Sequence, residues 1–529
     1  MIENPEKVRI VLVGEGTYPY EVGGVSVWAH LLIQNLQEID FILMPIMMHP
    51  YVKLKYEVPS NVIDVIKVPL WGTEEPTEYV RAVPFSTILY SKIRTTESII
   101  KEKFIPIFDT LVDHIYGITD DMDELGEILF QFYWFFQTYD YHTTFRSKLV
   151  WDKFKEKIGQ IYADAQGDVP SVYDTVEALR YMFRFFITLL PPVPYADIYH
   201  TSAAAFCGLP CLIAKKLHGS RFLLTEHGIY IREQMLQASR IKMPLRTKEF
   251  LMNLITMVAR INYYHADIIS PVCDYNKRWE EQWGALPSRI RTIYNGIDTE
   301  RFKRLDLPSR ERLTVIMVAR IDPLKDIESY IHTCALVAKE IPTVLFKMYG
   351  PKLDPDYYEL CEELVISLGV QNNFVFAGLT SNPVEAYNEG DVVMLTSISE
   401  AFPFVVLEAM ACERVMVSSD VGGTKEVLLE GLGFVVKPKD YKTFAQKVLL
   451  VLNDRVMREE MGIAAREHVL NGFRIEDMVF NYRKLYRDLY EIPSSVELAH
   501  HRNTPSEEKL SDDELEAEIS ELFSSSDDK

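Results

Sequence analysis

Apolar residues follow two different spacings along this chain, and the spacing changes twice. Near the N-terminus, short apolar runs occur at 8–13, 41–46 and 62–68; Gly14 ends the first of them, and a helical pattern follows Gly24. From about 74 to 192 the apolar residues are instead spaced as in long helices and are rich in aromatic side chains. We therefore expect a strand-and-helix region that is interrupted by a helical insertion.

Strand and helix patterns alternate again after the insertion. The expected strands begin near Asp197, Phe222, Asp267, Arg291, Thr314, Val344, Phe374, Asp391, Val415 and Phe434. Such alternation predicts parallel sheets with helices on both faces. Gly284, Pro287, Gly296 and Pro308 cluster in the middle of this region and favour a domain boundary there. The sequence thus predicts an α/β fold of two Rossmann-like, doubly wound domains that face each other across a cleft.

The expected limits follow from these changes of pattern. The first domain spans 1–290 and contains the helical insertion at about 74–192, and the second domain spans 291–475. A helix at 476–493 is expected to cross back to the first domain. The last residues, 494–529, are rich in Ser, Asp and Glu, so they are expected to form an acidic disordered tail.

Charge and cysteine content narrow the class of protein. The formal net charge is −21, and an acidic chain binds polyanions poorly, so we expect no nucleic-acid partner. The six cysteines form no C-x-x-C pair, as is typical of reduced thiols. The N-terminus does not resemble a signal peptide, and no apolar run reaches the roughly 20 residues that span a bilayer. A cytoplasmic protein is expected, with the aromatic segments 128–139 and 183–190 either buried or used for docking.

The segment from Glu400 to Ala411 carries the strongest chemical signal. It follows an expected strand and opens a helix, and Pro403 suits the first helical position. The amides of Phe404 and Val405 would then lie at the positive end of the helix, where phosphate groups bind. Glu408, one turn further on, could accept hydrogen bonds from a ribose diol, and Glu400 precedes the helix on the side of the sugar.

Two cations follow the expected strand at 314–318. Arg320 and Lys325 are suited to a diphosphate, the first as a planar fork and the second as a point charge. They would also neutralise the charge that develops on a leaving diphosphate, a role that a metal ion could otherwise fill. We therefore expect no metal and no cofactor.

Glycines and histidines follow the strands of the first domain. Gly23 and Gly24 allow a ligand to approach the backbone, although the loop lacks the third glycine of a dinucleotide fingerprint and is not a P-loop. His227 follows the strand at 222–225, and His200 is a second candidate for contact with a sugar. No metal-binding D-x-D triplet follows a central strand.

These motifs together resemble the retaining glycosyltransferases of family 4, which have the GT-B fold, and within that family the PelF-like group of cytosolic enzymes for the Pel exopolysaccharide. The resemblance rests on GEGTYPYEVGGVSVW at 14–28, TEHGIYIRE at 225–233, RIDPLKD at 320–326 and LTSISEAFPFVVLEAMA at 395–411. It implies a UDP-sugar donor in the second domain, an acceptor in the first, and transfer with retention.

The resemblance also implies a role for each matching residue. Arg320 and Lys325 would hold the diphosphate with the amides of Phe404 and Val405, Glu408 the ribose and Glu400 the donor sugar. Gly23 and Gly24 would approach the diphosphate from the first domain, and Gly350 would line the base pocket. Many relatives carry His-x-His where this chain has His200-Thr201-Ser202, so His227 joins Glu400, Lys325 and Arg320 as a catalytic candidate.

The sequence therefore predicts a metal-independent glycosyltransferase that moves a sugar from a UDP-sugar to a growing glycan or exopolysaccharide. A UDP-sugar epimerase or phosphorylase on the same fold is one alternative. Another is a non-catalytic nucleotide-sugar-binding subunit that docks to a membrane polysaccharide synthesis or export complex. Peripheral attachment to the inner face of the membrane would accompany such docking.

Overall fold

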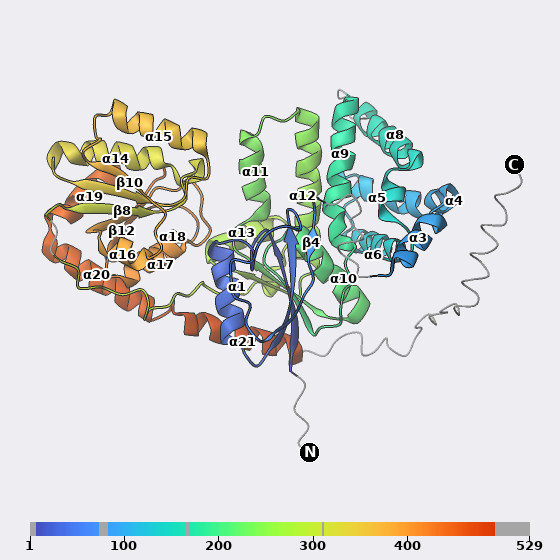
Figure 1. Ribbon diagram of the computed structural model, residues 1–529, viewed down its shortest axis with the longest axis horizontal. Helices are drawn as coiled ribbons and strands as arrows, with labels where there is room; N and C mark the ends of the chain where they lie inside the picture. The colour runs from blue at the N-terminus through green and yellow to red at the C-terminus, as the bar shows by residue number, and fades with distance from the viewer. Residues whose placement is uncertain (1–6, 73–82, 165–168, 309–310, 492–529) are drawn as a thin grey trace, which may run out of the picture. The chain divides into compact units, whose positions relative to one another are not determined.

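The computed structural model describes residues 7–72, 83–164, 169–308 and 311–491 of the chain. The tail expected over 494–529 lies outside these residues. The described residues belong to one compact unit, Met1–Glu491, which contains two separate parallel sheets (Figure 1).

The first sheet is parallel throughout, and its strand order reverses next to its first strand. Its path runs β3-β2-β1-β5-β6-β7, and β4 pairs with β2. The strands are β1 (Arg9–Glu15), β2 (Asp40–Met47), β3 (Val62–Val65), β4 (Val68–Pro69), β5 (Ile198–Thr201), β6 (Arg221–Glu226) and β7 (Ile268–Pro271). In register, Val11 of β1 lies between Ile42 of β2 and Tyr199 of β5. The central strands are buried on both faces, which explains their unbroken apolar runs.

The second sheet repeats this arrangement. Its order is β10-β9-β8-β11-β12-β13, so the reversal lies between β8 and β11. The strands are β8 (Thr314–Val318), β9 (Leu345–Tyr349), β10 (Phe374–Gly378), β11 (Val392–Leu395), β12 (Val415–Ser419) and β13 (Gly433–Val436). Figure 1 shows α14 and α15 on one face of this sheet and α16, α17 and α20 on the other. The expected fold class of two Rossmann-like parallel-sheet domains is confirmed.

Helices complete both domains. Those of the first domain outside the insertion are α1 (Gly24–Asn35), α10 (Leu209–His218), α11 (Tyr230–Arg240), α12 (Leu245–His265) and α13 (Asp274–Gln282). Those of the second are α14 (Ile327–Glu340), α15 (Pro355–Ser367), α16 (Pro383–Asn388), α17 (Phe404–Ala411), α18 (Thr424–Val427), α19 (Tyr441–Asn453) and α20 (Arg455–Leu470).

The strand expected at Arg291–Tyr294 is wrong. The chain runs beside β7 there and makes two backbone hydrogen bonds, from Arg291 N to Ile269 O at 2.8 Å and from Ile293 N to Pro271 O at 3.0 Å. A parallel ladder would also need an N–H at position 271, and proline has none. The pairing therefore ends after a single bridge between Ile269 and Ile290.

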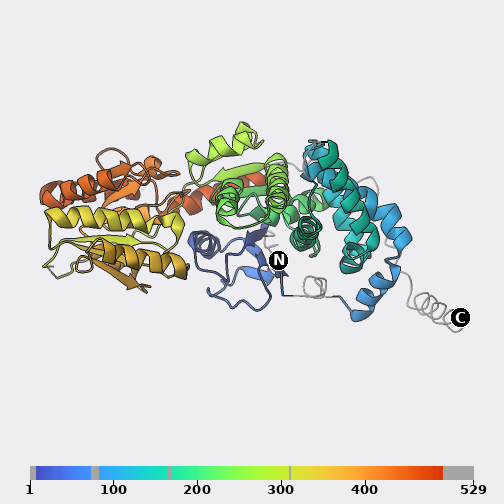
Figure 2. The same cartoon turned by 90° about the horizontal axis from the view of Figure 1, so that it is seen from above.

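The region between β4 and β5 is helical in all its described elements. These are α3 (Phe85–Arg94), α4 (Glu97–Ile99), the π-helix η1 (Ile100–Phe104), α5 (Ile105–Ile115), α6 (Met122–Thr138), α7 (Tyr141–Phe145), α8 (Lys148–Asp164), α9 (Val172–Phe185) and the short 3-10 helix η2 (Phe186–Leu189). The two views in Figures 1 and 2 show these helices packed side by side. Phe132 and Phe136 of α6 pack with Phe104 and Phe145 in its centre. The aromatic segment 128–139 is thus mainly core, although Trp134 is 49% exposed.

The last described helix, α21 (Ile475–Glu491), packs against the first domain. Tyr482 and Tyr486 are fully buried, and the Tyr486 hydroxyl lies 2.7 Å from Nδ1 of His200 in β5. The two chain crossings between the domains are hydrogen-bonded to each other, because Ile297 N donates to Phe473 O and Ile475 N donates to Ile297 O, both at 3.0 Å. In the described part of the chain, every helix is too short or too polar to cross a bilayer.

This double crossing makes a stability prediction. A Cβ at Gly296 would overlap the carbonyl oxygen of Arg474, so Gly296→Ala should destabilise the protein by about 1–3 kcal/mol. Thermal unfolding would measure the effect. Gly472→Ala is the matched control, since a Cβ there meets no atom within 4 Å, and it should change stability by less than about 1 kcal/mol. Equal stability of both variants would contradict the role given to this crossing.

Candidate functional site

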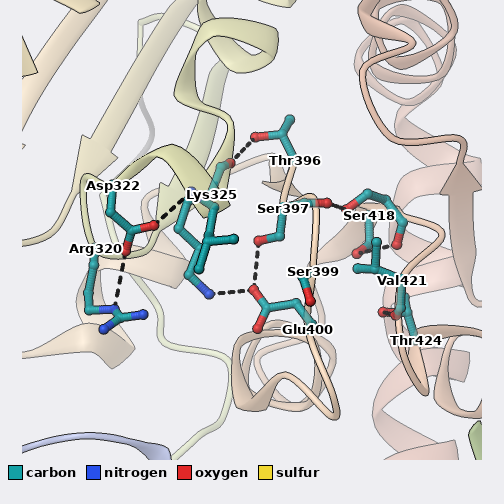
Figure 3. Close-up of polar contacts among 12 residues, drawn as sticks. Arg320, Asp322, Lys325, Thr396, Ser397, Ser399, Glu400, Ser418, Val421 and Thr424 are labelled. Carbon is teal, nitrogen blue, oxygen red and sulfur yellow. Dashed lines mark hydrogen bonds and ion pairs between the residues drawn. The ribbon is translucent and has the colours of Figure 1, made fainter. Parts of the chain in front are cut away.

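An ion pair in the second domain joins the loops after β8 and β11. Lys325 Nζ and Glu400 Oε1 form an ion pair, and Ser397 Oγ donates to the same carboxylate oxygen at 2.6 Å (Figure 3). Each charged side chain is only 15% exposed. Because the carboxyl ends of β8 and β11 lie where the strand order reverses, this pair occupies the position at which open α/β sheets bind ligands.

Backbone contacts fix these two loops to each other. Thr396 Oγ1 donates to the carbonyl oxygens of Lys325 and Asp326, each at 2.9 Å, and Ile398 N donates to Leu324 O at 2.8 Å. Asp326 adopts a left-handed conformation, with φ of 48°, and caps α14 through Ser329 N. The ion pair is therefore held by the main chain as well as by its own charges.

The end of β12 and the loop after it contact the backbone of the loop that carries Glu400. Gly423 N donates to Ala401 O at 2.7 Å, and Ser419 Oγ donates to Ser397 O at 2.6 Å. Gly422 has a φ of +56°, and a Cβ there would overlap the carbonyl oxygens of Glu400 and Ala401. Sequence reasoning missed this contribution, although the Gly422-Gly423 pair directly after an expected strand was a usable signal.

Arg320 and Gly350 lie side by side at the ends of β8 and β9. Arg320 is 56% exposed and its Nε lies 3.4 Å from Asp322 Oδ2 (Figure 3). Gly350 adopts φ of +156°, and a Cβ there would overlap the carbonyl of Ala319, the residue before Arg320. Among the described residues, the guanidinium is held by this surface ion pair, which costs little to exchange for another anion.

Helix α17 begins one residue later than expected. Pro403 has φ −75° and ψ 119°, an extended conformation, and is the N-cap residue of the helix. The prediction that it occupies the first helical position is therefore wrong. Phe404 and Val405 occupy the first two helical positions, whose N–H groups have no partner within the helix. The correction leaves both amides at the positive end of the helix, where an anion is stabilised.

Glu408 lies one turn along α17. The hydroxyl of Tyr387, in α16, donates to Glu408 Oε2 at 2.5 Å. Burial raises the pKa of the Glu408 carboxyl above its ordinary value, and the Tyr387 hydrogen bond partly opposes this shift. Glu408 therefore has a hydrogen-bonding partner within the protein that a ribose hydroxyl would have to join or replace.

The glycine loop of the first domain contacts α17 of the second. A Cβ at Gly24 would lie 3.3 Å from the ring of Phe404, so this position leaves little room for a side chain. Gly23, the N-cap of α1, has an extended backbone with φ of 176°. The structure thus brings the Gly23-Gly24 pair next to the helix start that carries the free amides.

The two histidines have different surroundings. His200 is fully buried, with Nδ1 near the Tyr486 hydroxyl and Nε2 2.8 Å from Thr225 Oγ1, so both ring nitrogens are occupied. His227 packs edge-on against Trp28, with 4.5 Å between ring centroids, and its Nε2 is buried without a hydrogen-bond partner. Burial lowers the pKa of both imidazoles to about 3, so both are neutral at neutral pH. His200 has a structural environment, and His227 is the histidine with a nitrogen left to bind a ligand.

Residues just after His227 reach towards Glu400. Arg232 Nη1 donates to Ser399 Oγ at 2.5 Å, which joins α11 of the first domain to the loop that carries Glu400. The side chain of the neighbouring Glu233 is exposed at the surface. Partial desolvation nevertheless raises the pKa of its carboxyl, Arg232 and Lys325 lower it, and Glu400 raises it further. The sequence motif contained both residues, but no pattern within it indicated this contact across the domains.

Buried carboxyl groups lie at the carboxyl ends of the first sheet. Burial raises the pKa of Glu15, at the end of β1, from 4.5 to about 7, and its Oε2 has no hydrogen-bond partner. Glu226, at the end of β6, accepts hydrogen bonds from the Tyr263 hydroxyl on both oxygens at 2.8 Å, and burial raises its pKa as well. In the described ranges, no three His, Cys, Asp or Glu side chains are grouped so that they could hold a metal ion.

This arrangement can bind a phosphorylated sugar carrier. Lys325, Arg320 and the two amides of α17 supply positive potential at the ends of β8 and β11, while Glu400 and Glu408 supply acceptors for hydroxyl groups. The residues expected to hold the donor gather at these ends: Gly23 and Gly24 follow β1, Arg320 and Lys325 follow β8, Gly350 follows β9, and Phe404, Val405 and Glu408 lie in α17. Arg232 of α11 reaches the loop after β11 through its bond to Ser399.

Two family models match the chain one after the other. The model described as a domain of unknown function (DUF3492) matches residues 8–288, and the model described as glycosyl transferases group 1 matches residues 298–468. The division between them falls at 289–297, within the region of the expected domain boundary.

Curated proteins resemble the chain over part of its length. N-acetyl-alpha-D-glucosaminyl L-malate synthase of Bacillus anthracis is 27% identical over 307 residues, which cover 55% of this chain and 75% of that protein. D-inositol 3-phosphate glycosyltransferase of Kribbella flavida is 29% identical over 208 residues, which cover 36% of this chain and 49% of that protein.

Solved structures resemble the whole described fold. Sucrose-phosphate synthase from Thermosynechococcus elongatus has a TM-score of 0.58 at 17% identity, over 92% of this chain and all of that one. HepE from Anabaena, solved with UDP and glucose, has a TM-score of 0.58 at 13% identity, over 91% of this chain and all of that one. At this identity the likeness shows the fold alone, which is the two-domain GT-B arrangement.

The raised pKa of Glu15 predicts a pH-dependent stability. The folded state holds this proton more tightly than the unfolded state, so the wild type should lose stability as the pH rises from about 4.5 through 7. Glu15→Gln cannot lose this proton. The free energy of unfolding of the variant, relative to that of the wild type, should therefore increase by up to about 3 kcal/mol between pH 5 and pH 8, and thermal unfolding would measure this. The exposed Glu21→Gln is the control. A Glu15→Gln difference that stays constant with pH would contradict this account.

Proposed function

We propose that this chain, which belongs to the DUF3492 family and is a glycosyltransferase of group 1, transfers a sugar from a UDP-sugar to a glycan acceptor with retention and without a metal ion. The observation that carries the proposal is the Lys325–Glu400 ion pair next to the free amides of α17. A diphosphate between Lys325 and these amides would leave its sugar beside Glu400. The motif resemblance to family 4 supports the retaining course.

The roles of the donor-side residues follow from their positions. Lys325 would neutralise the charge that develops on the leaving diphosphate, and Arg320 would exchange its surface partner Asp322 for a phosphate oxygen. Glu400, whose Oε1 is occupied by Lys325 and Ser397, would use its second oxygen, Oε2, for a hydroxyl of the donor sugar. Glu408 would bind the ribose and Gly350 would line the base pocket.

In the transfer step, the bond from the anomeric carbon to the diphosphate oxygen breaks, and a bond from the same carbon to the acceptor oxygen forms on the same face. The acceptor proton passes to the leaving diphosphate oxygen, so the reaction needs no base from the protein. His227, neutral because of its burial, would donate to or accept from a sugar hydroxyl with its unpartnered Nε2.

UDP is proposed as the nucleotide because the motifs resemble those of the PelF-like group. HepE, a structural neighbour that was solved with UDP and glucose, agrees with that choice. A growing exopolysaccharide in the cytoplasm is the corresponding acceptor, and docking to a membrane synthesis complex would deliver it. The choice of donor sugar depends on contacts around Glu400 and Phe404.

A donor panel scored by UDP release tests this function. Wild-type protein should release UDP from one UDP-sugar in the presence of a saccharide acceptor, and excess EDTA should not reduce the rate. Lys325→Ala should lower kcat by about 10²–10³-fold, because it removes the charge that stabilises the leaving group and leaves Glu400 without its cationic partner.

Lys339→Ala is the matched control, because Lys339 is an exposed lysine on α14 of the same domain. It should keep wild-type turnover. Near-normal turnover of Lys325→Ala, with its fold verified by circular dichroism, would refute the proposed role of the ion pair.

A further inference from the structure

We infer that the turn from His227 to Glu233 forms the acceptor subsite, with Glu233 binding an acceptor hydroxyl, and that this subsite takes a neutral saccharide and rejects acceptors bearing a carboxylate or phosphate. The inference rests on the proposed function and adds to it the chemical class of the acceptor.

The backbone of this turn is shaped around the Glu233 carboxylate. Glu233 Oε1 lies so close to Gly228 that a Cβ at position 228 would overlap it. Glu233 N also donates to Ile229 O at 3.0 Å, which anchors the first turn of α11 above the glycine. The carboxylate is therefore packed directly on the residue that follows His227.

A second observation points to a ligand at the same place. His227 Nε2 is buried and has no hydrogen-bond partner, although buried polar atoms are nearly always paired. The ring is fixed by its edge-on contact with Trp28, so the nitrogen cannot readily turn to find another partner. A sugar hydroxyl can donate to or accept from this nitrogen while a second hydroxyl donates to Glu233.

The turn lies beside the reacting end of the donor site. Arg232 joins α11 to the donor loop through its bond to Ser399, the residue before Glu400. Glu400, Lys325 and Arg320 all affect the charge state of Glu233, which places its carboxylate within electrostatic reach of the donor side chains. A hydroxyl bound by Glu233 would therefore lie near the anomeric carbon that the Lys325–Glu400 pair positions.

The charges of the turn select against anions. Glu233 is the one carboxylate of the turn, and Glu226 precedes the turn at the end of β6, where it is held by Tyr263. In the sequence, the loops at 14–23, 202–208 and 226–233 contain a single cation, Arg232, and its Nη1 is bound to Ser399. An acceptor carboxylate or phosphate would be repelled by the Glu233 carboxylate, while a neutral hydroxyl could donate its proton to it.

Steady-state kinetics of Glu233→Gln test the binding role. The variant should raise the KM for the acceptor at least tenfold, while UDP affinity by calorimetry and the KM for the donor change less than twofold. Glu281→Gln, at an exposed carboxylate on α13 of the same domain, is the matched control and should match wild type. An unchanged acceptor KM in Glu233→Gln would overturn the inference.

An acceptor panel on the wild type tests the class of acceptor without any variant. Neutral disaccharides such as lactose, maltose and chitobiose should support UDP release in the presence of the donor, and L-malate and inositol 3-phosphate should not. Preference for either anion would overturn the inference and leave the proposed function standing. Absence of UDP release with every donor and acceptor would overturn both.

Discussion

The site depends on one ion pair, Lys325 with Glu400, which joins the two loops at which the second sheet reverses its strand order. Opposite charges that are largely shielded from water persist only when both are paired and hydrogen-bonded. Ser397 supplies a further bond to the carboxylate, and Thr396 ties the backbone of the Lys325 loop to β11. Because Gly422 and Gly423 support the same loop from β12, the carboxylate and the ammonium are positioned before any ligand binds.

Two segments of the first domain contact the part of the second domain that carries this ion pair. Gly24 lies against Phe404, and Arg232 bonds to Ser399, so the glycine loop and α11 both contact the loops that carry the donor-side residues. Burial makes His227 a neutral hydrogen-bonding group rather than a cation. Lys325 and Arg320 thus belong to the second domain, while the turn with His227 and Glu233 belongs to the first.

Local sequence patterns could predict the parts of this site that are encoded within one segment. Arg320 with Lys325, and Glu400 with Glu408, each follow an apolar strand, and the strand order then brings them together. The contacts of Arg232 with Ser399 and of Gly422 with Glu400 join segments that are distant in sequence, and no spacing rule links such pairs. The expected strand at 291–294 failed for a similar reason, because the proline that ends its ladder is in another strand, β7. Pro403 shows that a helix start is predicted less precisely than the helix itself.

A crystal structure of the protein with UDP would test the central claim most directly. The account predicts the β-phosphate within hydrogen-bonding distance of Lys325 Nζ and of the Phe404 and Val405 amides, with the ribose hydroxyls on Glu408. It would be contradicted by UDP bound elsewhere, or by a diphosphate that contacts neither Lys325 nor the start of α17.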